Sequence, residues 1–245
     1  MRHLILGDLH ANLPALEAVL RDARSRGFDR AVCLGDIVGY GGQPNEVIEA
    51  VRDLAPARQV RGNHDKAASG ISRGETFNDS ARSAIGWTRA ALRPASAAYL
   101  KALAAGPADA GGWLIAHGSP LDEEAYILGD GDAAEAFGRL AFPLAFFGHT
   151  HFACALEQAP GERPALMPLR HEEPLSLRPG RRYLVNPGSV GQPRDHDPRA
   201  AYVLYDDARA EVLPVRVPYD VEAAQSAIEA AGLPRPLGLR LALGV

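Results

Sequence analysis

The apolar positions in the first part of the chain alternate between short continuous runs and stripes with helical spacing. The runs are typical of short buried β-strands and lie at residues 2–6, 31–34, 58–60, 113–116 and 144–147. One helical stripe begins after Asn12 and Pro14, and a second begins after Pro44. Strands that alternate with helices in this way predict an α/β fold.

The second part of the chain follows a different pattern. Two consecutive helices, separated at Pro94, are predicted within residues 77–104, and we interpret this segment as a helical insertion or lid. After a helix at 132–140, runs of β-formers predict antiparallel strands at 165–169, 182–185, 201–205 and 211–217, followed by a helix at 221–231. The simplest architecture is a single α/β domain over residues 1–245. It would be a four-layer αββα sandwich with two facing mixed β-sheets and helices outside both.

Composition narrows the classes of partner. The 26 Lys and Arg residues against 30 Asp and Glu give a net charge of −4 without any block of like charge, so nucleic acid is not an expected partner. No apolar run approaches the roughly 20 residues of a membrane helix, and no leader is recognisable, so we expect a cytoplasmic protein. Cys33 and Cys154 do not suggest a disulfide framework, which agrees with a reducing compartment.

Polar side chains gather where the five predicted strands of the first part end. Because the carboxyl ends of strands in α/β sheets form ligand sites, we expect these side chains to converge. They are Asp8, His10, Asp36, Asn63, His64, His117, His149 and His151. The alternative is a set of helix caps and turn residues, since Asp, Asn and Gly are common there. Burial of so many polar groups without partners would cost several kcal/mol per group, which favours a bound cation.

The donor types indicate which ions would bind. Carboxylate and amide oxygens mixed with imidazole nitrogens, and no thiolate, suit divalent Mn, Fe, Zn, Co or Ni, and the pattern does not separate these from Mg. Seven ligands are more than one such ion usually takes from a protein. Two ions that share a bridging carboxylate would use them all at a spacing of about 3.5–4 Å, as in phosphoryl-transfer sites.

Five short motifs in this order resemble the calcineurin-like metallophosphoesterase superfamily. They are D-x-H at Asp8–His10, G-D at Gly35–Asp36, G-N-H-D at Gly62–Asp65, H-G at His117–Gly118 and G-H-T-H at Gly148–His151. The segments GDIVGYG and NPGSVGQPRD extend the similarity past residue 190, toward small bacterial and archaeal phosphodiesterase-type members. The resemblance covers roughly four fifths of the chain.

The resemblance implies a role for each position. It assigns Asp8, His10 and His151 to a first metal ion, assigns Asn63, His117 and His149 to a second, and makes Asp36 the bridge. A water shared by the two ions, with its pKa lowered from about 15.7 toward 7, would attack phosphorus in line. His64 would stabilise the transition state and protonate the leaving oxygen as a general acid. Asp65 would either orient His64 or cap the following segment.

One departure from the family pattern concerns substrate binding. The Ser/Thr protein phosphatases of this superfamily carry an Asp-Arg pair after G-D, whereas this chain has Gly39 and Tyr40 there, which argues against protein phosphatase activity. A basic phosphate contact must then come from elsewhere, and the candidates are Arg194 and Arg61.

The sequence therefore predicts a two-metal phosphoesterase that hydrolyses a phosphodiester or a phosphomonoester of a small substrate. A dinucleoside polyphosphate hydrolase is the alternative within the same chemistry, and it would need a nucleoside pocket near residues 77–104. From another class, the fold could serve as a non-catalytic interaction scaffold, as in the retromer subunit that resembles this family. The presence of His64 and of all seven ligand positions argues against the scaffold.

Overall fold

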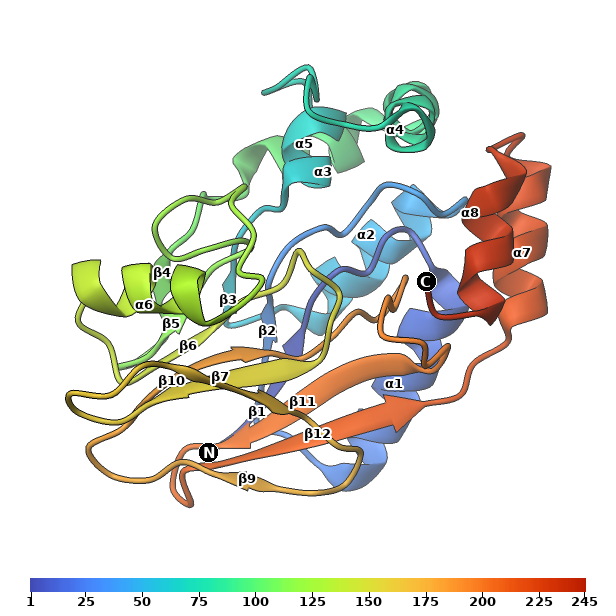
Figure 1. Ribbon diagram of the computed structural model, residues 1–245. Coiled ribbons are helices and arrows are strands. Elements are labelled where there is room, and N and C mark those ends of the chain that lie inside the picture. Colours follow the sequence, from blue (N-terminus) through green and yellow to red (C-terminus); the bar gives the residue numbers. More distant parts are fainter.

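The computed structural model describes residues 1–245 and contains two six-stranded β-sheets, which Figure 1 shows with their flanking helices. The first sheet has the order β3 (Arg58–Gln59), β2 (Arg30–Cys33), β1 (Arg2–Leu6), β11 (Ala200–Asp206), β12 (Glu211–Val217) and β9 (Leu175–Ser176). The second has the order β4 (Ala108–Asp109), β5 (Leu114–Ile115), β6 (Leu144–Phe146), β10 (Arg182–Asn186), β7 (Cys154–Gln158) and β8 (Ala165–Pro168). Both sheets mix parallel and antiparallel pairs.

Helices cover the outer faces of both sheets and the edge where the site lies. The longer ones are α1 (Leu13–Arg26), α2 (Pro44–Leu54), α4 (Asp79–Ala91), α5 (Pro94–Ala102), α6 (Asp130–Arg139) and α7 (Val221–Ala230). The shorter ones are α3 (Asn63–Ala68), α8 (Arg235–Leu239) and a 3-10 turn at Arg240–Ala242. In Figure 1, α3, α4 and α5 lie together at the top of the molecule, and α7 and α8 lie side by side. None of these helices has the length and apolar character needed to cross a membrane.

The alternation of side chains along β1 explains the layers. Leu4 and Leu6 belong to the large apolar cluster that the first sheet forms with α1, α2 and α7, whereas Ile5 between them belongs to the cluster between the two sheets. On the far face of the second sheet, Phe147 packs with Phe137 of α6 in a third cluster. Successive residues of a strand point to opposite faces, so each buried strand contributes to two clusters. The predicted four-layer αββα sandwich is confirmed.

Several details of the predicted elements need correction. The strands after residue 153 are not all antiparallel, because β10 lies between β6 and β7 and pairs in parallel with β6. The β7 strand was not predicted, since four of its five residues are buried and its sequence CALEQ lacks a polar alternation. The tail after residue 231 forms α8 and the 3-10 turn, although Pro234 and Pro236 suggested an irregular end. Helix α3, which begins at the predicted ligand Asn63, was also not expected.

A buried carboxylate ties β7 to β10. Glu157 accepts a hydrogen bond from the Tyr183 hydroxyl at 2.6 Å and from Arg178 Nη2 at 2.7 Å, and it forms an ion pair with Arg181 at 3.2 Å. Burial alone would raise the pKa of Glu157, but the hydrogen bonds from Tyr183 and Arg178 lower it below its ordinary value of 4.5. The charged form of Glu157 therefore stabilises the folded state.

Glu157→Gln is expected to lower the free energy of unfolding at pH 7 by about 1–3 kcal/mol, because the amide keeps the shape of the side chain and loses its charge. A lowered folded-state pKa gives stability that is present above the unfolded pKa and is lost as the pH falls through the folded pKa. The difference between wild type and variant in urea unfolding should therefore shrink below pH 4.5. Glu162→Gln, in an exposed position of the same hairpin, is the control. A difference independent of pH would contradict this assignment.

Candidate metal centre

The carboxyl ends of five strands bring the predicted ligands together. Asp8 and His10 follow β1, Asp36 follows β2, and Asn63 lies beyond β3, all in the first sheet. The remaining histidines follow strands of the second sheet: His117 follows β5, and His149 and His151 follow β6. The site thus lies where the ends of the two facing sheets meet, and each sheet supplies part of it.

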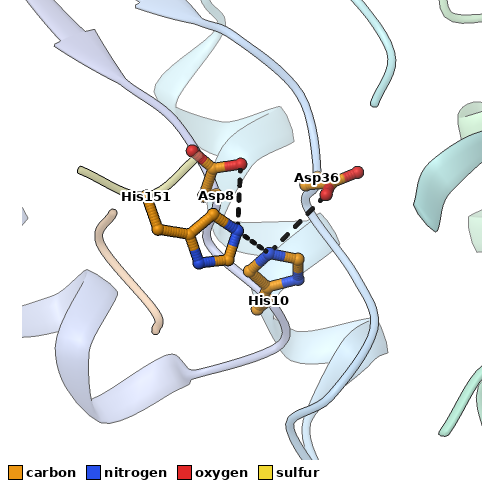
Figure 2. A group of neighbouring side chains, drawn as sticks. All are labelled: Asp8, His10, Asp36 and His151. Atoms are coloured by element: carbon orange, nitrogen blue, oxygen red, sulfur yellow. Dashed lines mark hydrogen bonds and ion pairs between the residues drawn. The ribbon is translucent and has the colours of Figure 1, made fainter. Parts of the chain in front are cut away.

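One group of donors surrounds the end of β1. Single donor atoms of Asp8, His10, Asp36 and His151 all lie within 4.8 Å of one another. Nε2 of His10 lies 3.0 Å from Nε2 of His151 and 3.6 Å from Asp36 Oδ2, and Nε2 of His151 lies 3.6 Å from Asp8 Oδ1. Figure 2 shows the two imidazole rings with these nitrogens turned toward each other, between the carboxylates of Asp8 and Asp36.

A second group shares Asp36 with the first. Donor atoms of Asp36, His117 and His149 also lie within 4.8 Å of one another. Nε2 of His117 lies 3.4 Å from Asp36 Oδ2, 3.2 Å from His149 Nδ1 and 3.1 Å from Asn63 Oδ1. Asp36 is therefore common to both groups, and the structure brings all seven predicted ligands into two adjoining clusters.

Main-chain carbonyls fix the tautomer of each of the four imidazoles. A carbonyl oxygen can only accept a hydrogen bond, so the ring nitrogen that faces it carries the proton, and the other nitrogen of the neutral ring keeps its lone pair. The pairs are His10 Nδ1 with Val38 at 3.2 Å, His117 Nδ1 with Leu34 at 2.9 Å, His149 Nε2 with Glu124 at 3.1 Å and His151 Nδ1 with Gln192 at 2.6 Å. In every case the ring nitrogen that does not face a carbonyl points into the cluster.

This arrangement fits divalent metal ions. In the first cluster two nitrogen lone pairs face each other, 3.0 Å apart for His10 and His151, with no proton left to share, and in the second cluster the nitrogens of His117 and His149 face each other at 3.2 Å. The four rings are at most 5% exposed, so water cannot screen their repulsion. A cation with an affinity for nitrogen and carboxylate oxygen resolves the conflict, and its usual ligands in proteins are these donors.

The electrostatics of the metal-free cluster point the same way. Burial raises the pKa of Asp8 to about 7 and lowers the pKa of His149 to about 3. Burial would also lower the pKa of His117, but the Asp36 carboxylate opposes it and raises that pKa to about 10. Asp36 and His117 thus stabilise each other's charge, whereas burial disfavours the charged forms of Asp8 and His149.

The main chain is strained at the ligand positions. Asp8, His10, Asp36, His149 and His151 all have positive φ angles, between 47° and 69°. Non-glycine residues seldom adopt this left-handed region, and each instance costs about 1–3 kcal/mol. Hydrogen bonds between the loops hold it: the Asp8 amide donates to Gly35 O at 3.0 Å and the His10 amide donates to Asp36 O at 2.9 Å.

The segment NPGSVGQP supports the ligands from behind. The Ser189 hydroxyl donates to the Asp8 carbonyl at 2.8 Å and accepts from the Gln192 amide at 2.7 Å. Asn186 Nδ2 donates to the Gly148 carbonyl at 2.9 Å. The side chains of Asn186 and Ser189 thus both shape the turn and support the loops that carry the ligands. Gln192, whose carbonyl orients His151, carried no signal because its contribution comes from the main chain.

His64 lies beside the two clusters without a carboxylate partner. Its ring stacks on Phe77 with a centroid distance of 4.6 Å, and its buried Nδ1 has no hydrogen-bond partner. Burial lowers the pKa of His64 to about 4. Asp65 does not contact this ring: its carboxylate accepts from the amides of Ile37, Val38 and Gly62 at 2.9–3.2 Å. Of the two roles considered for Asp65, the structure shows capping.

A cavity of about 290 Å³ opens onto the clusters. His64 and Arg194 line it together with Phe77, and so does Tyr126, whose ring stacks on His149 at 4.0 Å. Arg194 Nη2 donates to Gln192 Oε1 at 3.1 Å, and its buried Nε has no partner. Arg61 is placed differently, because both Nε and Nη2 donate to the Glu123 carboxylate at 3.0 and 2.9 Å and the side chain is not part of the cavity lining.

Comparisons with known proteins agree with this site. The sequence model of the calcineurin-like phosphoesterase superfamily domain matches residues 1–208. An uncharacterized protein of Methanocaldococcus jannaschii is 37% identical over 246 aligned residues, which cover 98% of this chain and 97% of that protein. These findings confirm the resemblance that the five motifs indicated.

Solved structures give the same result for the fold. The crystal structure of a metallophosphoesterase from Sphaerobacter thermophilus superposes with a TM-score of 0.89 at 43% identity, covering 100% of this chain and 99% of that chain. The crystal structure of a hypothetical protein from Pyrococcus horikoshii superposes with a TM-score of 0.80 at 21% identity, covering 100% and 98% of the two chains. The likeness to the Pyrococcus horikoshii protein shows the fold alone.

Gly62→Ala is expected to weaken metal binding about 10–100-fold, the usual cost of disturbing the support of a ligand. A Cβ at Gly62 would overlap Asp36 Oδ1, so the shared carboxylate must move. Gly86→Ala in α4 is the matched control, because a Cβ there meets nothing within 4 Å. The measurement is a calorimetric titration of the chelated proteins with Mn²⁺. Equal affinity in Gly62→Ala and wild type would show that Asp36 does not bind metal.

Proposed function

The chain belongs to the calcineurin-like phosphoesterase superfamily, and on that premise we propose that it is a two-metal-dependent phosphoesterase. Its substrate would be a small phosphodiester or phosphomonoester. The observation that carries the proposal is the position of Asp36 between two pairs of facing imidazole nitrogens. One shared carboxylate between two clusters is the arrangement that two closely spaced ions require.

The ligands divide between the two ions according to distance. Asp8, His10 and His151 would hold the first ion, and Asn63, His117 and His149 would hold the second. Asp36 would bridge them. When bound, the two ions supply Lewis acidity, which lowers the pKa of water toward 7 and neutralises charge on the phosphate. The carbonyls behind the four rings would keep the lone pairs directed at the ions through the reaction.

His64 would act on the leaving group. It lies in the cavity lining, and Phe77 and Tyr40 hold its ring at centroid distances of 4.6 and 4.5 Å. Its lowered pKa makes the free ring neutral at neutral pH. A phosphate anion in the cavity favours the protonated form, because a nearby opposite charge raises the pKa of an imidazole. The protonated ring then donates to the departing oxygen as a general acid.

Arg194 would bind the phosphate group. Its guanidinium lines the cavity, and its unpartnered Nε supplies a donor that a phosphate oxygen can accept. Arg61, the other candidate for the phosphate contact, would instead hold the loop that contains Glu123.

A dinucleoside polyphosphate hydrolase is the second candidate function. It would need a pocket for a nucleoside near residues 77–104, and Phe77, Asn78 and Ala81 from this region line the cavity. We interpret the segment as a helical insertion whose first turn forms one wall of the site. The charge and size of this wall would select the organic part of the substrate.

Two measurements on the chelated protein, reloaded with Mn, Ni, Zn or Mg, test the proposal. One is the turnover of bis-p-nitrophenyl phosphate and p-nitrophenyl phosphate, and the other is the number of bound metal ions. Asp36→Asn is expected to lose at least one ion and nearly all activity. His64→Ala is expected to keep both ions and to lose about 10²–10⁴-fold in kcat, the usual contribution of a general acid. Two bound ions without turnover of either substrate would favour the scaffold, and no bound ion would refute the site.

The Arg194→Ala and Arg61→Ala variants are expected to differ in steady-state kinetics. Arg194→Ala should raise KM about tenfold or more, because a charge-assisted hydrogen bond to phosphate is lost. Arg61→Ala should keep KM within about threefold and lower the thermal stability, since it removes a partly buried ion pair. The opposite pattern would transfer the phosphate contact to Arg61.

A further inference from the structure

A second cavity adjoins the metal cavity. It has a volume of about 460 Å³ and shares Tyr40 and Asn78 with the lining of the metal cavity. Its other walls are the first turn of α4, at Asp79 and Ser80, and the end of the chain, at 236–240. A substrate bound at the metal site can therefore extend past Tyr40 into this second space.

Each of the two cavities that Tyr40 lines also contains an arginine. Arg194 lines the metal cavity, with its guanidinium carbon 5.8 Å from the centre of the Tyr40 ring, and Arg240 lines the adjoining cavity. Neither forms an ion pair with an Asp or Glu side chain in the structure. Arg240 Nε donates to the Val245 main-chain oxygen, which leaves its two Nη groups without a protein partner.

The two charges are close enough to affect each other. Burial lowers the pKa of Arg240, and the positive charge of Arg194 lowers it further. The terminal Val245 oxygen contacts only Nε of Arg240, so a bound anion can still reach the two Nη groups and relieve the repulsion between the two cations. The one acid in the adjoining cavity is Asp79, an exposed residue at the start of α4 whose carboxylate makes no hydrogen bond or ion pair.

We propose that Arg240, together with Arg194, forms a subsite for a second phosphate group of the substrate, next to the phosphate that is hydrolysed. The proposal rests on the proposed function, because it places the first phosphate at the metal site. A pair of guanidinium groups can donate to several phosphate oxygens at once, whereas a bound carboxylate would offer them only two oxygens. The second phosphate belongs either to a phosphoanhydride chain or to a separate ester on the same molecule.

Calorimetric titration of the metal-loaded full chain tests the subsite without requiring turnover. The probes are thymidine 5′-phosphate, thymidine 5′-diphosphate and thymidine 3′,5′-bisphosphate. At least one of the two-phosphate probes is expected to bind about tenfold or more tightly than the monophosphate, which corresponds to one charged hydrogen bond. Preference for the diphosphate identifies a phosphoanhydride chain, and preference for the bisphosphate identifies a separate ester.

Two variants test whether the tighter binding of a two-phosphate probe comes from Arg240. Arg240→Gln should remove the advantage of the second phosphate and change the affinity for the monophosphate less than about threefold. Arg235→Gln is the matched control, because Arg235 is an exposed arginine at the start of α8, the helix that precedes Arg240, and this variant should keep the advantage. Equal binding of all three probes to the wild type, or an advantage that survives Arg240→Gln, would overturn the subsite.

Asp79→Asn tests the subsite by removing a negative charge from its wall. This variant remains informative if Arg240→Gln folds poorly. Removal of this negative charge should tighten binding of the preferred two-phosphate probe about two- to fivefold and leave the monophosphate unchanged. Unchanged binding of both probes would contradict the subsite. Turnover of bis-p-nitrophenyl phosphate, measured on the same preparations, reports separately on the proposed function.

Discussion

The rest of this structure depends on a conflict between nitrogen lone pairs. His10 and His151 face each other at 3.0 Å with no hydrogen to place between them, and the Asp36 carboxylate stands between this pair and the facing nitrogens of His117 and His149. Other features serve to maintain this otherwise unfavourable arrangement. The carbonyls behind the rings hold the tautomers, and the loops hold five ligand residues in left-handed main-chain conformations. A glycine at position 62 gives Asp36 the room it needs. A fold that accepts this much strain at one point is stabilised elsewhere, and the three apolar clusters supply that stability.

The sequence was sufficient to predict that the candidate ligands converge, because each follows an apolar run and the end of a strand is a position that periodicity can locate. The same reasoning gave the two sheets and the helices outside them. It failed where the decisive contact is made by the main chain or by a distant partner. Gln192 orients His151 through its carbonyl, which no side-chain pattern reveals. Arg61 and Arg194 looked equivalent in the sequence, and only the position of Glu123, 62 residues after Arg61, separates them. The β7 strand was missed for a related reason, since a strand buried on both faces has no alternation to detect.

Segments other than the ligand loops shape the two cavities. The metal cluster comes from short loops after strands, whereas the cavity walls come from the first turn of α4 and from the chain after residue 231. Chemistry and selectivity are thus carried by different segments. The ligand loops are held by many hydrogen bonds between loops, whereas Asp79, in the first turn of α4, forms no hydrogen bond or ion pair with its carboxylate. A family that keeps one reaction and varies its substrates would change residues of this second kind.

The position of β1 has a consequence for how the protein is made. This strand lies inside the first sheet between β2 and β11, and its partner β11 is almost 200 residues later in the chain. At about 5–20 residues per second, a ribosome needs roughly 10–40 seconds to synthesise the intervening chain. During that time the apolar edge of β1 has no antiparallel neighbour, and NPGSVGQP, the segment that supports Asp8 and His151, has not yet reached its place for most of the interval. The nascent chain therefore exposes an unpaired strand edge, and the loops that carry the candidate ligands lack their support until synthesis is nearly complete.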